Sequence, residues 1–281
     1  MRKIIIAATV FLTGALGFSQ VQTPAASPLG KVHQTVGLTE VSVEYSRPSA
    51  KGRNIFGNLV PFGKIWRTGA NKNTIVYFGD DVVIGGKTLK KGEYALFVSP
   101  KPDAWDVYFY TDTNNWGVPE KWNEEKVAAK VTVKPITLSN FVETFTIGIN
   151  ALDNDYGHLE LSWEKTMVSV KFEVPTAKIA HASINKALAG PDQNTYYQAA
   201  NYYYQSGADI NQALEWINKA VEMAGKEAPF WYLRLKSLIQ AKAGDKKGAI
   251  ETAQRSLEAA EKAGNADYIK LNKDSISEWS K

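Results

Sequence analysis

The chain has 281 residues, a formal net charge of +4 and 44% hydrophobic residues. That length corresponds to about two domains of roughly 150 residues each, and the ordinary balance of apolar and charged residues excludes a disordered chain or a bundle of membrane helices. The net charge is too small to attract nucleic acid by bulk electrostatics, so no nucleic-acid partner is expected.

The first 19 residues predict a cleavable export signal. Arg2 and Lys3 precede an apolar stretch over residues 4–16, and small residues at positions 17 and 19 suit a signal peptidase that cuts after Ser19. The stretch is short for a transmembrane helix, so no membrane span is expected once the signal is removed. The chain contains no cysteine, which excludes disulfides and a lipid-modified cysteine. A periplasmic or secreted protein is therefore predicted.

Residues 20–35 contain two prolines and many small side chains, which predicts a linker. From residue 36 to residue 175, short runs of β-branched and aromatic residues alternate with polar ones and are separated by Gly, Pro, Asn or Asp. About nine strands without intervening helices predict an antiparallel sandwich or flattened barrel.

Three local features of this β domain can be predicted. Gly85-Gly86 forms a hairpin turn because glycine accepts the backbone angles of a two-residue turn. Residues 118–126 form a short helix, with Pro119 in its first turn. Residues 163–166 connect the last two strands of the domain.

Beyond Pro175 the apolar period becomes helical, so residues 176–281 are predicted to form a helical domain. Two copies of a helix–turn–helix plan have their first helices ending near Gly207 and Gly244, 37 residues apart. The plan resembles tetratricopeptide repeats, whose period is about 34 residues. Two copies are few for independent stability, so these helices are expected to pack on the β domain. Their many tyrosines suggest a groove for a protein partner, with tight helix packing as the alternative.

The segment "SRPSAKGRNIFGNLVPFGKIWRTGAN" (residues 46–71), followed by "GGKTLKKGEYALFVSP" (residues 85–100) and "LELSWEKTMVSV" (residues 159–170), resembles the family catalogued as domain of unknown function 2911. The resemblance covers residues 26–175. It implies a secreted bacterial protein with a β domain and repeat-like helices, but no established activity. Relatives carry Glu where this chain has Lys72, which weakens a catalytic interpretation. We call residues 62–74 the signature loop.

Between Glu44 and Asp80 the chain has no acidic residue but six cations, namely Arg47, Lys51, Arg53, Lys64, Arg67 and Lys72. A cluster of cations on one connection creates a local positive field for an oxyanion, which the planar guanidinium of Arg binds in a bidentate manner. The alternative is that these cations pair with Glu40, Glu44 or acids of neighbouring strands and organise the loop.

The predicted ligand site consists of Arg47, Arg53, Trp66, Arg67, Asn71 and Thr74. The three arginines would pair with a negatively charged group of the ligand. Trp66 would stack on a sugar ring or instead fill the core, and Asn71 would donate and accept hydrogen bonds. Trp116 and Trp122 lie in a polar segment and are expected to be exposed. The three scattered histidines predict no metal site, and no cofactor is expected.

Three functions remain open at this point. The first is a non-enzymatic module that binds an anionic or glycan ligand through the signature loop. The second is a hydrolase of envelope or extracellular polysaccharide, with acids supplied by other loops. The third is a structural scaffold whose signature loop is an internal brace.

Overall fold

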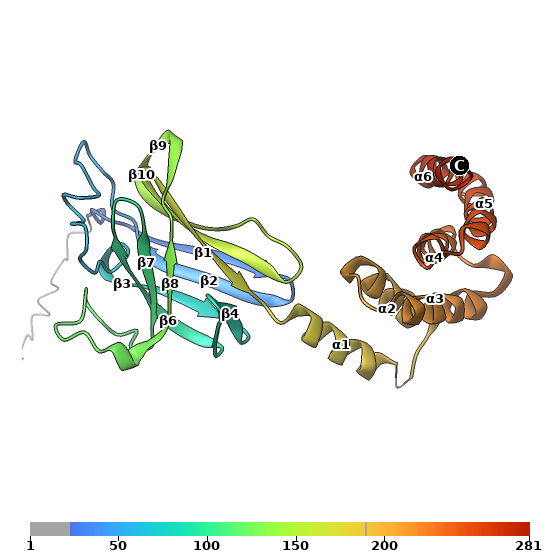
Figure 1. Cartoon of the computed structure of the whole chain (residues 1–281), viewed down its shortest axis with the longest axis horizontal. Helices are drawn as coiled ribbons and strands as arrows, with labels where there is room; N and C mark the ends of the chain where they lie inside the picture. The colour runs from blue at the N-terminus through green and yellow to red at the C-terminus, as the bar shows by residue number, and fades with distance from the viewer. Residues whose placement is uncertain (1–22, 189) are drawn as a thin grey trace, which may run out of the picture.

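The computed structural model describes residues 23–188 and 190–281, so the predicted export signal lies outside the described residues. Ten strands come first in the chain and six α-helices follow them (Figure 1). The predicted fold class, a β sandwich followed by a helical domain, is therefore confirmed.

The strands form two antiparallel sheets. The larger sheet has the order β1-β2-β3-β6-β7-β8, with bounds Leu29–Val36 (β1), Thr39–Ser46 (β2), Ala70–Phe78 (β3), Gly92–Pro100 (β6), Trp105–Tyr110 (β7) and Val127–Val133 (β8). The smaller sheet has the order β5-β4-β10-β9, with bounds Val82–Ile84 (β4), Lys87–Leu89 (β5), Ile136–Asn150 (β9) and Tyr156–Glu173 (β10).

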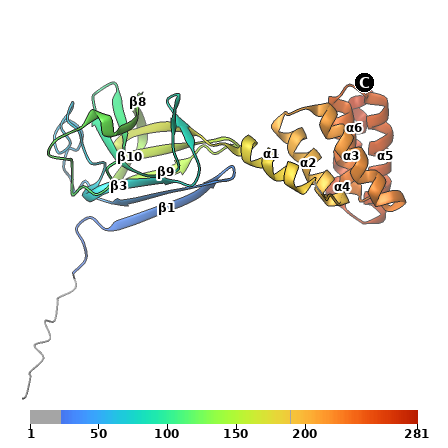
Figure 2. The same cartoon turned by 90° about the horizontal axis from the view of Figure 1, so that it is seen from below.

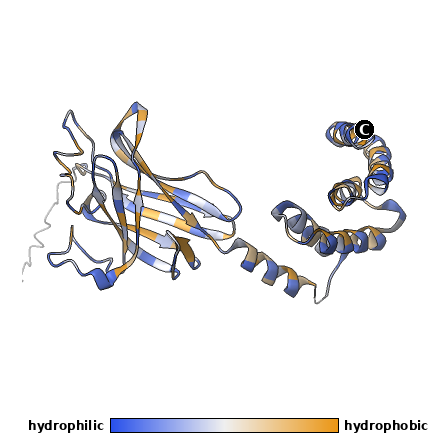
Figure 3. Ribbon diagram, viewed as in Figure 1, coloured by the Kyte–Doolittle hydropathy of each residue, from blue (hydrophilic) through white to orange (hydrophobic). Residues whose placement is uncertain are grey.

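The core lies between the two sheets and follows from the alternation of each strand. Val41, Val43 and Tyr45 of β2 are buried while Glu40 and Glu44 are exposed, because successive side chains point to opposite faces of a sheet. The same period in β10 buries one face of that strand against the larger sheet. Apolar and polar positions accordingly alternate along the strands (Figure 3).

Strand β1 occupies the second half of the expected linker, so the linker interpretation of residues 20–35 is wrong from Leu29 onward. The strand pairs along its whole length with β2, from Leu29 opposite Ser46 to Val36 opposite Thr39. It is an edge strand whose side chains are largely polar and exposed. Since few of them need burial, the sequence carries only a weak strand signal.

Strand β10 also differs from its prediction. Residues 163–166 do not connect two strands but lie inside β10, and the turn between β9 and β10 falls at residues 151–155 instead. The pairing with β9 shifts on either side of Glu164, whose φ is 51°. Such a bulge interrupts the alternation without ending the strand, which explains why the sequence pattern suggested a break. The predicted turn at Gly85-Gly86 is confirmed, with φ of 57° and 79°.

The segment after β7 covers the outer face of the larger sheet. Trp122 stacks on Tyr110, with ring centroids 4.6 Å apart, and meets Phe97 edge-on at 5.5 Å. Trp122 is thus half-buried, and the expectation that it is exposed is wrong. The helix predicted over residues 118–126 is reduced to one 3-10 turn, η1 (Glu124–Lys126), because the chain before that turn is used to place Trp122 on the sheet.

The helical part contains α1 (Thr176–Ala187), α2 (Gln193–Ser206), α3 (Ile210–Ala224), a 3-10 turn η2 (Gly225–Glu227), α4 (Phe230–Lys242), α5 (Lys246–Lys262) and α6 (Ala266–Trp279). Side chains of Asp192, Asp209, Asp245 and Asn265 accept backbone N–H groups at the starts of α2, α3, α5 and α6, which is the role of an N-cap residue. The pairs α2–α3 and α4–α5 confirm the predicted helix–turn–helix plan. The likeness to tetratricopeptide repeats stays a prediction.

Helix α1 lies between the sheets and the remaining helices, and α2–α6 stand apart from the strands in both views (Figures 1 and 2). The expected packing of these helices on the β domain is therefore wrong for this structure. At the start of α1, the Thr176 hydroxyl donates to the carbonyl of Asn154. Within the described residues, no helix is both long and apolar enough to cross a membrane.

Asp106 on β7 is the centre of a polar cluster on the outer face of the larger sheet. Its carboxylate accepts a hydrogen bond from the Thr132 hydroxyl at 2.6 Å and lies 3.3 Å from the ammonium groups of both Lys101 and Lys130. Burial alone would raise the pKa of Asp106, but the hydrogen bonds from Thr132, Lys130 and Lys101 outweigh it and hold the pKa below its ordinary value.

A carboxyl whose pKa is lower in the folded state stabilises the fold at neutral pH, and this stabilisation is lost as the pH falls through that pKa. We expect Asp106→Asn to lower the unfolding free energy at pH 7 by about 1.5–3 kcal/mol and to flatten its acid dependence. Urea unfolding at pH 7 and pH 3 measures both quantities. Asp81→Asn is the control, since Asp81 pairs with an exposed lysine and its replacement should cost clearly less stability than that of Asp106. Equal losses for the two variants would contradict this account.

Candidate functional site

Trp66 fixes the signature loop to both sheets. Its backbone N–H donates to Val98 O at 2.7 Å, and its carbonyl accepts from Val98 N at 3.0 Å, which joins it to β6 of the larger sheet. Its ring stacks on Trp163 of β10 in the smaller sheet, with centroids 5.7 Å apart and planes 21° apart. The indole N–H of Trp66 donates to Gly69 O at 3.1 Å. The loop is therefore rigidly placed at one end of the core.

After Trp66 the backbone adopts conformations that most side chains avoid. Thr68 has φ of 57° and is fully buried, Gly69 has φ of 150°, and Asn71 has φ of 58°. A β-branched residue such as Thr is rarely found at positive φ. The buried Thr74 hydroxyl donates to Thr68 O and helps to hold this arrangement. Strain of about 1–3 kcal/mol per residue persists only where surrounding contacts enforce it, and such residues cluster at functional sites.

A pocket of about 310 Å³ opens beside this loop. Arg53, Trp66, Arg67 and Trp163 line it, together with apolar side chains such as Leu59 and small residues. No Asp or Glu is among its lining residues in the described part of the chain. We call it the cationic pocket, because its only charged side chains are arginines.

Arg67 differs from the other predicted site residues in the hydrogen bonding of its side chain. Its Nε atom is buried and has no hydrogen-bond partner within residues 23–188 and 190–281. A buried N–H donor that gives up water without a replacement costs about 1–3 kcal/mol. One terminal nitrogen points toward Gly117, where an added Cβ would lie 3.5 Å from it. The side chain of Arg67 is thus partly desolvated, and its Nε has no acceptor among the described residues.

The other polar residues of the predicted site hold the protein together. Arg47 donates from Nε to Phe145 O at 3.2 Å and from Nη2 to the Thr146 hydroxyl at 2.9 Å, which ties β2 to β9. Arg53 donates from Nε to Ala50 O at 2.9 Å and from Nη2 to Ser49 O at 2.7 Å. These contacts brace the connection after β2.

The six cations of the acid-free segment form no ion pair with a carboxylate of the described residues. Their expected pairing with Glu40 or Glu44 is therefore not observed. The nearby acids are used differently. Glu143 accepts the backbone N–H of Lys51 at 2.7 Å, and Glu164 accepts that of Ile55 at 3.0 Å. Two carboxylates therefore contact the backbone of the segment, but none of its six cationic side chains is ion-paired within the described residues.

Three of the six predicted residues, Arg53, Trp66 and Arg67, line the cationic pocket. Asn71 lines an adjoining second pocket instead, whereas Arg47 and Thr74 line neither one.

Two tryptophans complete the comparison between the predicted and the observed site. Sequence reasoning missed Trp163, although the alternation Leu159, Leu161, Trp163 in β10 would have placed it on the buried face. Trp116 is 82% exposed, as expected.

No group of three or more His, Cys, Asp or Glu side chains able to hold a metal ion is found in the described part of the chain. The cationic pocket offers guanidinium donors and aromatic carbon, which are not metal ligands. The arrangement is suited to an anionic or ring-shaped organic ligand.

A β sandwich with an arginine-lined pocket at one end thus describes the first two thirds of the chain. The family model described as "Protein of unknown function (DUF2911)" matches residues 27–172, and the chain belongs to this family. The resemblance based on the signature loop and its flanking motifs is confirmed. No curated protein matches the sequence.

The strained backbone makes a sharp test of the loop. A Cβ on Gly69 would lie 2.9 Å from Ser46 O and 3.2 Å from the Thr74 hydroxyl oxygen, at φ of 150°. We expect Gly69→Ala to lower the unfolding free energy by about 2–3 kcal/mol, measured by urea unfolding. Gly63→Ala is the matched control, since Gly63 has φ of 73° with no atom within 4 Å of the added Cβ, and should cost about 1 kcal/mol. If the two variants lose the same stability, the close approach at Gly69 has no energetic role.

Proposed function

We propose that this is an exported, non-enzymatic protein whose β sandwich binds an anionic or glycan ligand in the cationic pocket, with the carboxylate of a sugar acid as the best fit. Export is supported by the basic and apolar pattern of residues 2–16. Binding is supported by the composition and shape of the pocket. The helical part adds contacts to a protein partner.

The observation that carries the proposal is the unpartnered Nε of Arg67. A carboxylate placed against Nε and one terminal nitrogen would accept two charge-assisted hydrogen bonds in the geometry that guanidinium favours. Arg53 lines the same pocket and adds positive charge although its own donors are occupied.

The size and apolar part of the pocket support a small ring-shaped ligand. Its volume of about 310 Å³ lies at the lower end of the range of about 300–1,000 Å³ for small-molecule sites. Trp66 contributes a partly exposed indole and Leu59 is 44% exposed, so carbon surface is present beside the guanidinium. A sugar acid combines the same two features, a C–H face and a carboxylate.

A polysaccharide hydrolase is less well supported. Glycoside hydrolysis generally uses two carboxyl groups on either side of the scissile bond, and no carboxylate lines the described pocket. The carboxylates of Glu143 and Glu164 already accept hydrogen bonds from the backbone N–H groups of Lys51 and Ile55. The scaffold function accounts for the hydrogen bonds of Arg47 and Arg53, but it gives no role to the guanidinium of Arg67.

Binding of galacturonate and of galactose to the mature protein, measured by isothermal titration calorimetry, tests the proposal. We expect galacturonate to bind more tightly than neutral galactose, and Arg67→Ala to weaken galacturonate binding at least about tenfold, because a hydrogen bond to a charged group is worth about 1.5–3 kcal/mol. Lys64→Ala removes an exposed cation of the same loop and should bind as the wild type does.

Two outcomes would contradict the pocket assignment. One is equal galacturonate affinity of the wild type and Arg67→Ala. The other is failure of the wild type to bind any anion of a panel of galacturonate, glucuronate, sulfate and phosphate.

The protein contacts proposed for the helical part have their own supporting observation at Arg234 of α4. Its Nη1 atom is buried and lacks a hydrogen-bond partner in the described residues. Burial lowers the pKa of Arg234, whereas Tyr204 on α2 and both Tyr268 and Asp274 on α6 act in the opposite direction. The guanidinium of Arg234 forms no ion pair with a carboxylate of the described residues, so it suits an acidic side chain of a partner segment.

We expect Arg234→Met to raise or leave unchanged the unfolding free energy, because replacing an unpaired buried cation by an apolar side chain removes a desolvation cost. The same variant should bind a fluorescein-labelled poly-glutamate octapeptide at least about tenfold more weakly than the wild type. Fluorescence polarisation measures this, with Lys246→Met, an exposed cation at the start of α5, as the charge-matched control. Unchanged peptide affinity in Arg234→Met would exclude Arg234 from the partner surface.

A further inference from the structure

A second pocket of about 320 Å³ adjoins the cationic pocket. Among its lining residues are Leu29, Ser46, Asn71 and Trp116. The two pockets share a wall, because Asn71 donates to Ser27 O at 3.4 Å and to the Ser46 hydroxyl at 3.2 Å, and Ser27 lines the cationic pocket. The signature loop thus presents one pocket on each side of residues 69–71.

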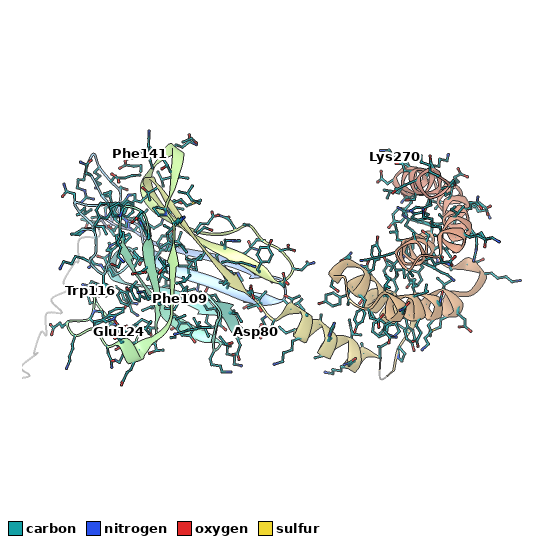
Figure 4. All side chains as sticks on the ribbon, in the orientation of Figure 1. Asp80, Phe109, Trp116, Glu124, Phe141 and Lys270 are labelled. Atoms are coloured by element: carbon teal, nitrogen blue, oxygen red, sulfur yellow. The ribbon has the colours of Figure 1, made fainter. Side chains whose placement is uncertain are left out.

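Trp116 is the most exposed large apolar side chain of the described residues, at 82%. The loop that carries it is nevertheless tied to β3, since Asn73 N–H donates to Asn115 O at 3.1 Å and Asn115 N–H donates to the Asn73 side chain at 2.9 Å. Figure 4 labels Trp116 at the end of the sandwich away from α1. Large aromatic rings are usually buried, so an exposed one on an anchored loop indicates a surface that contacts a ligand or partner.

Arg67 of the cationic pocket also lies beside the loop that carries Trp116. Gly117 follows Trp116 directly, and an added Cβ at Gly117 would lie 3.5 Å from a terminal nitrogen of Arg67. Arg67 therefore lies beside the residue that follows Trp116 in the chain, which brings the cationic pocket close to the second pocket.

The charges of the two pockets differ. The cationic pocket has arginines and no acid among its described lining residues, whereas the second pocket contains both Glu44 and Lys72. The second pocket is therefore close to neutral, and its polar groups include the side chains of Asn71 and Ser46. Amide and hydroxyl groups around an exposed indole suit the hydroxyls and C–H face of a sugar ring better than a second anion.

From these contacts we infer that the two pockets form one extended site for a linear acidic oligosaccharide of at least two sugar units. One unit places its carboxylate on Arg67, and the next unit stacks on Trp116 and bonds to Asn71. This extended site rests on the anion pocket proposed above, and it adds the length of the ligand and the role of Trp116.

Calorimetry with galacturonate and with its linear tetramer tests the extended site. The wild type should bind the tetramer at least about fivefold more tightly than the monomer, the size of effect that an added aromatic contact gives. Trp116→Ala should lose that gain and still bind the monomer with wild-type affinity, while Trp116→Phe should retain most of it. Because Trp116 is exposed, its truncation is expected to leave the fold intact, and circular dichroism verifies this.

The outcomes separate the two proposals. Wild-type affinity of Trp116→Ala for the tetramer, or equal monomer and tetramer affinities in the wild type, would overturn the extended site and leave the anion pocket standing. Failure of the wild type to bind either galacturonate or its tetramer would overturn both the anion pocket and the extended site as binding sites for uronates. Loss of monomer binding in Trp116→Ala would also contradict the division into two subsites.

Discussion

The stack of Trp66 on Trp163 joins a loop residue to both sheets at once. Through its backbone Trp66 continues the larger sheet beside Val98, and through its ring it packs on the smaller sheet. Everything that follows in the signature loop depends on this fixed point. Since Arg67 is the next residue, its guanidinium is carried to a half-buried position that its own charge would not favour. Thr68 and Gly69 then lead the chain into β3 with φ of 57° and 150°.

The loop therefore combines two roles. Most of its hydrogen bonds, and those of the connection before it, hold the sandwich closed, as Arg47 and Arg53 illustrate. Arg67 is the exception, because its Nε is buried without an acceptor in the part of the chain that the structure describes. Bracing and binding are compatible, since a rigid frame keeps a desolvated donor in place until a ligand arrives and reduces the entropy lost on binding. The strained backbone beside Arg67 is consistent with such a frame.

Much of the fold could be predicted because burial imposes a period on the sequence. The alternation of β2 correctly predicted a strand, and the glycines at 85 and 86 correctly predicted a hairpin. The helical period after Pro175 correctly predicted the change from strands to helices. Strand β1 was missed because an edge strand buries little, and the break assumed at residues 163–166 is a bulge that leaves the strand continuous. Both errors come from long-range pairing, which a local pattern does not contain.

The site was only partly predictable for the same reason. The absence of acids between Glu44 and Asp80 identified the cationic segment, but it did not distinguish arginines that brace the loop from the one that lacks a partner. That distinction depends on the acceptors that the fold brings within reach, such as Phe145 O of β9 for Arg47, 98 residues away in the chain, and Ala50 O for Arg53. Likewise, Trp116 and Trp122 share a polar segment, yet only Trp122 finds the ring of Tyr110 on the sheet.

The central claim is that Arg67 holds a desolvated donor for an external carboxylate. A crystal structure of the protein with galacturonate tests it most directly. The account predicts a carboxylate oxygen within hydrogen-bonding distance of Arg67 Nε, with Trp66 against the sugar ring. A structure in which Arg67 Nε donates to a protein carbonyl, or in which the sugar acid lies away from the cationic pocket, would contradict the account.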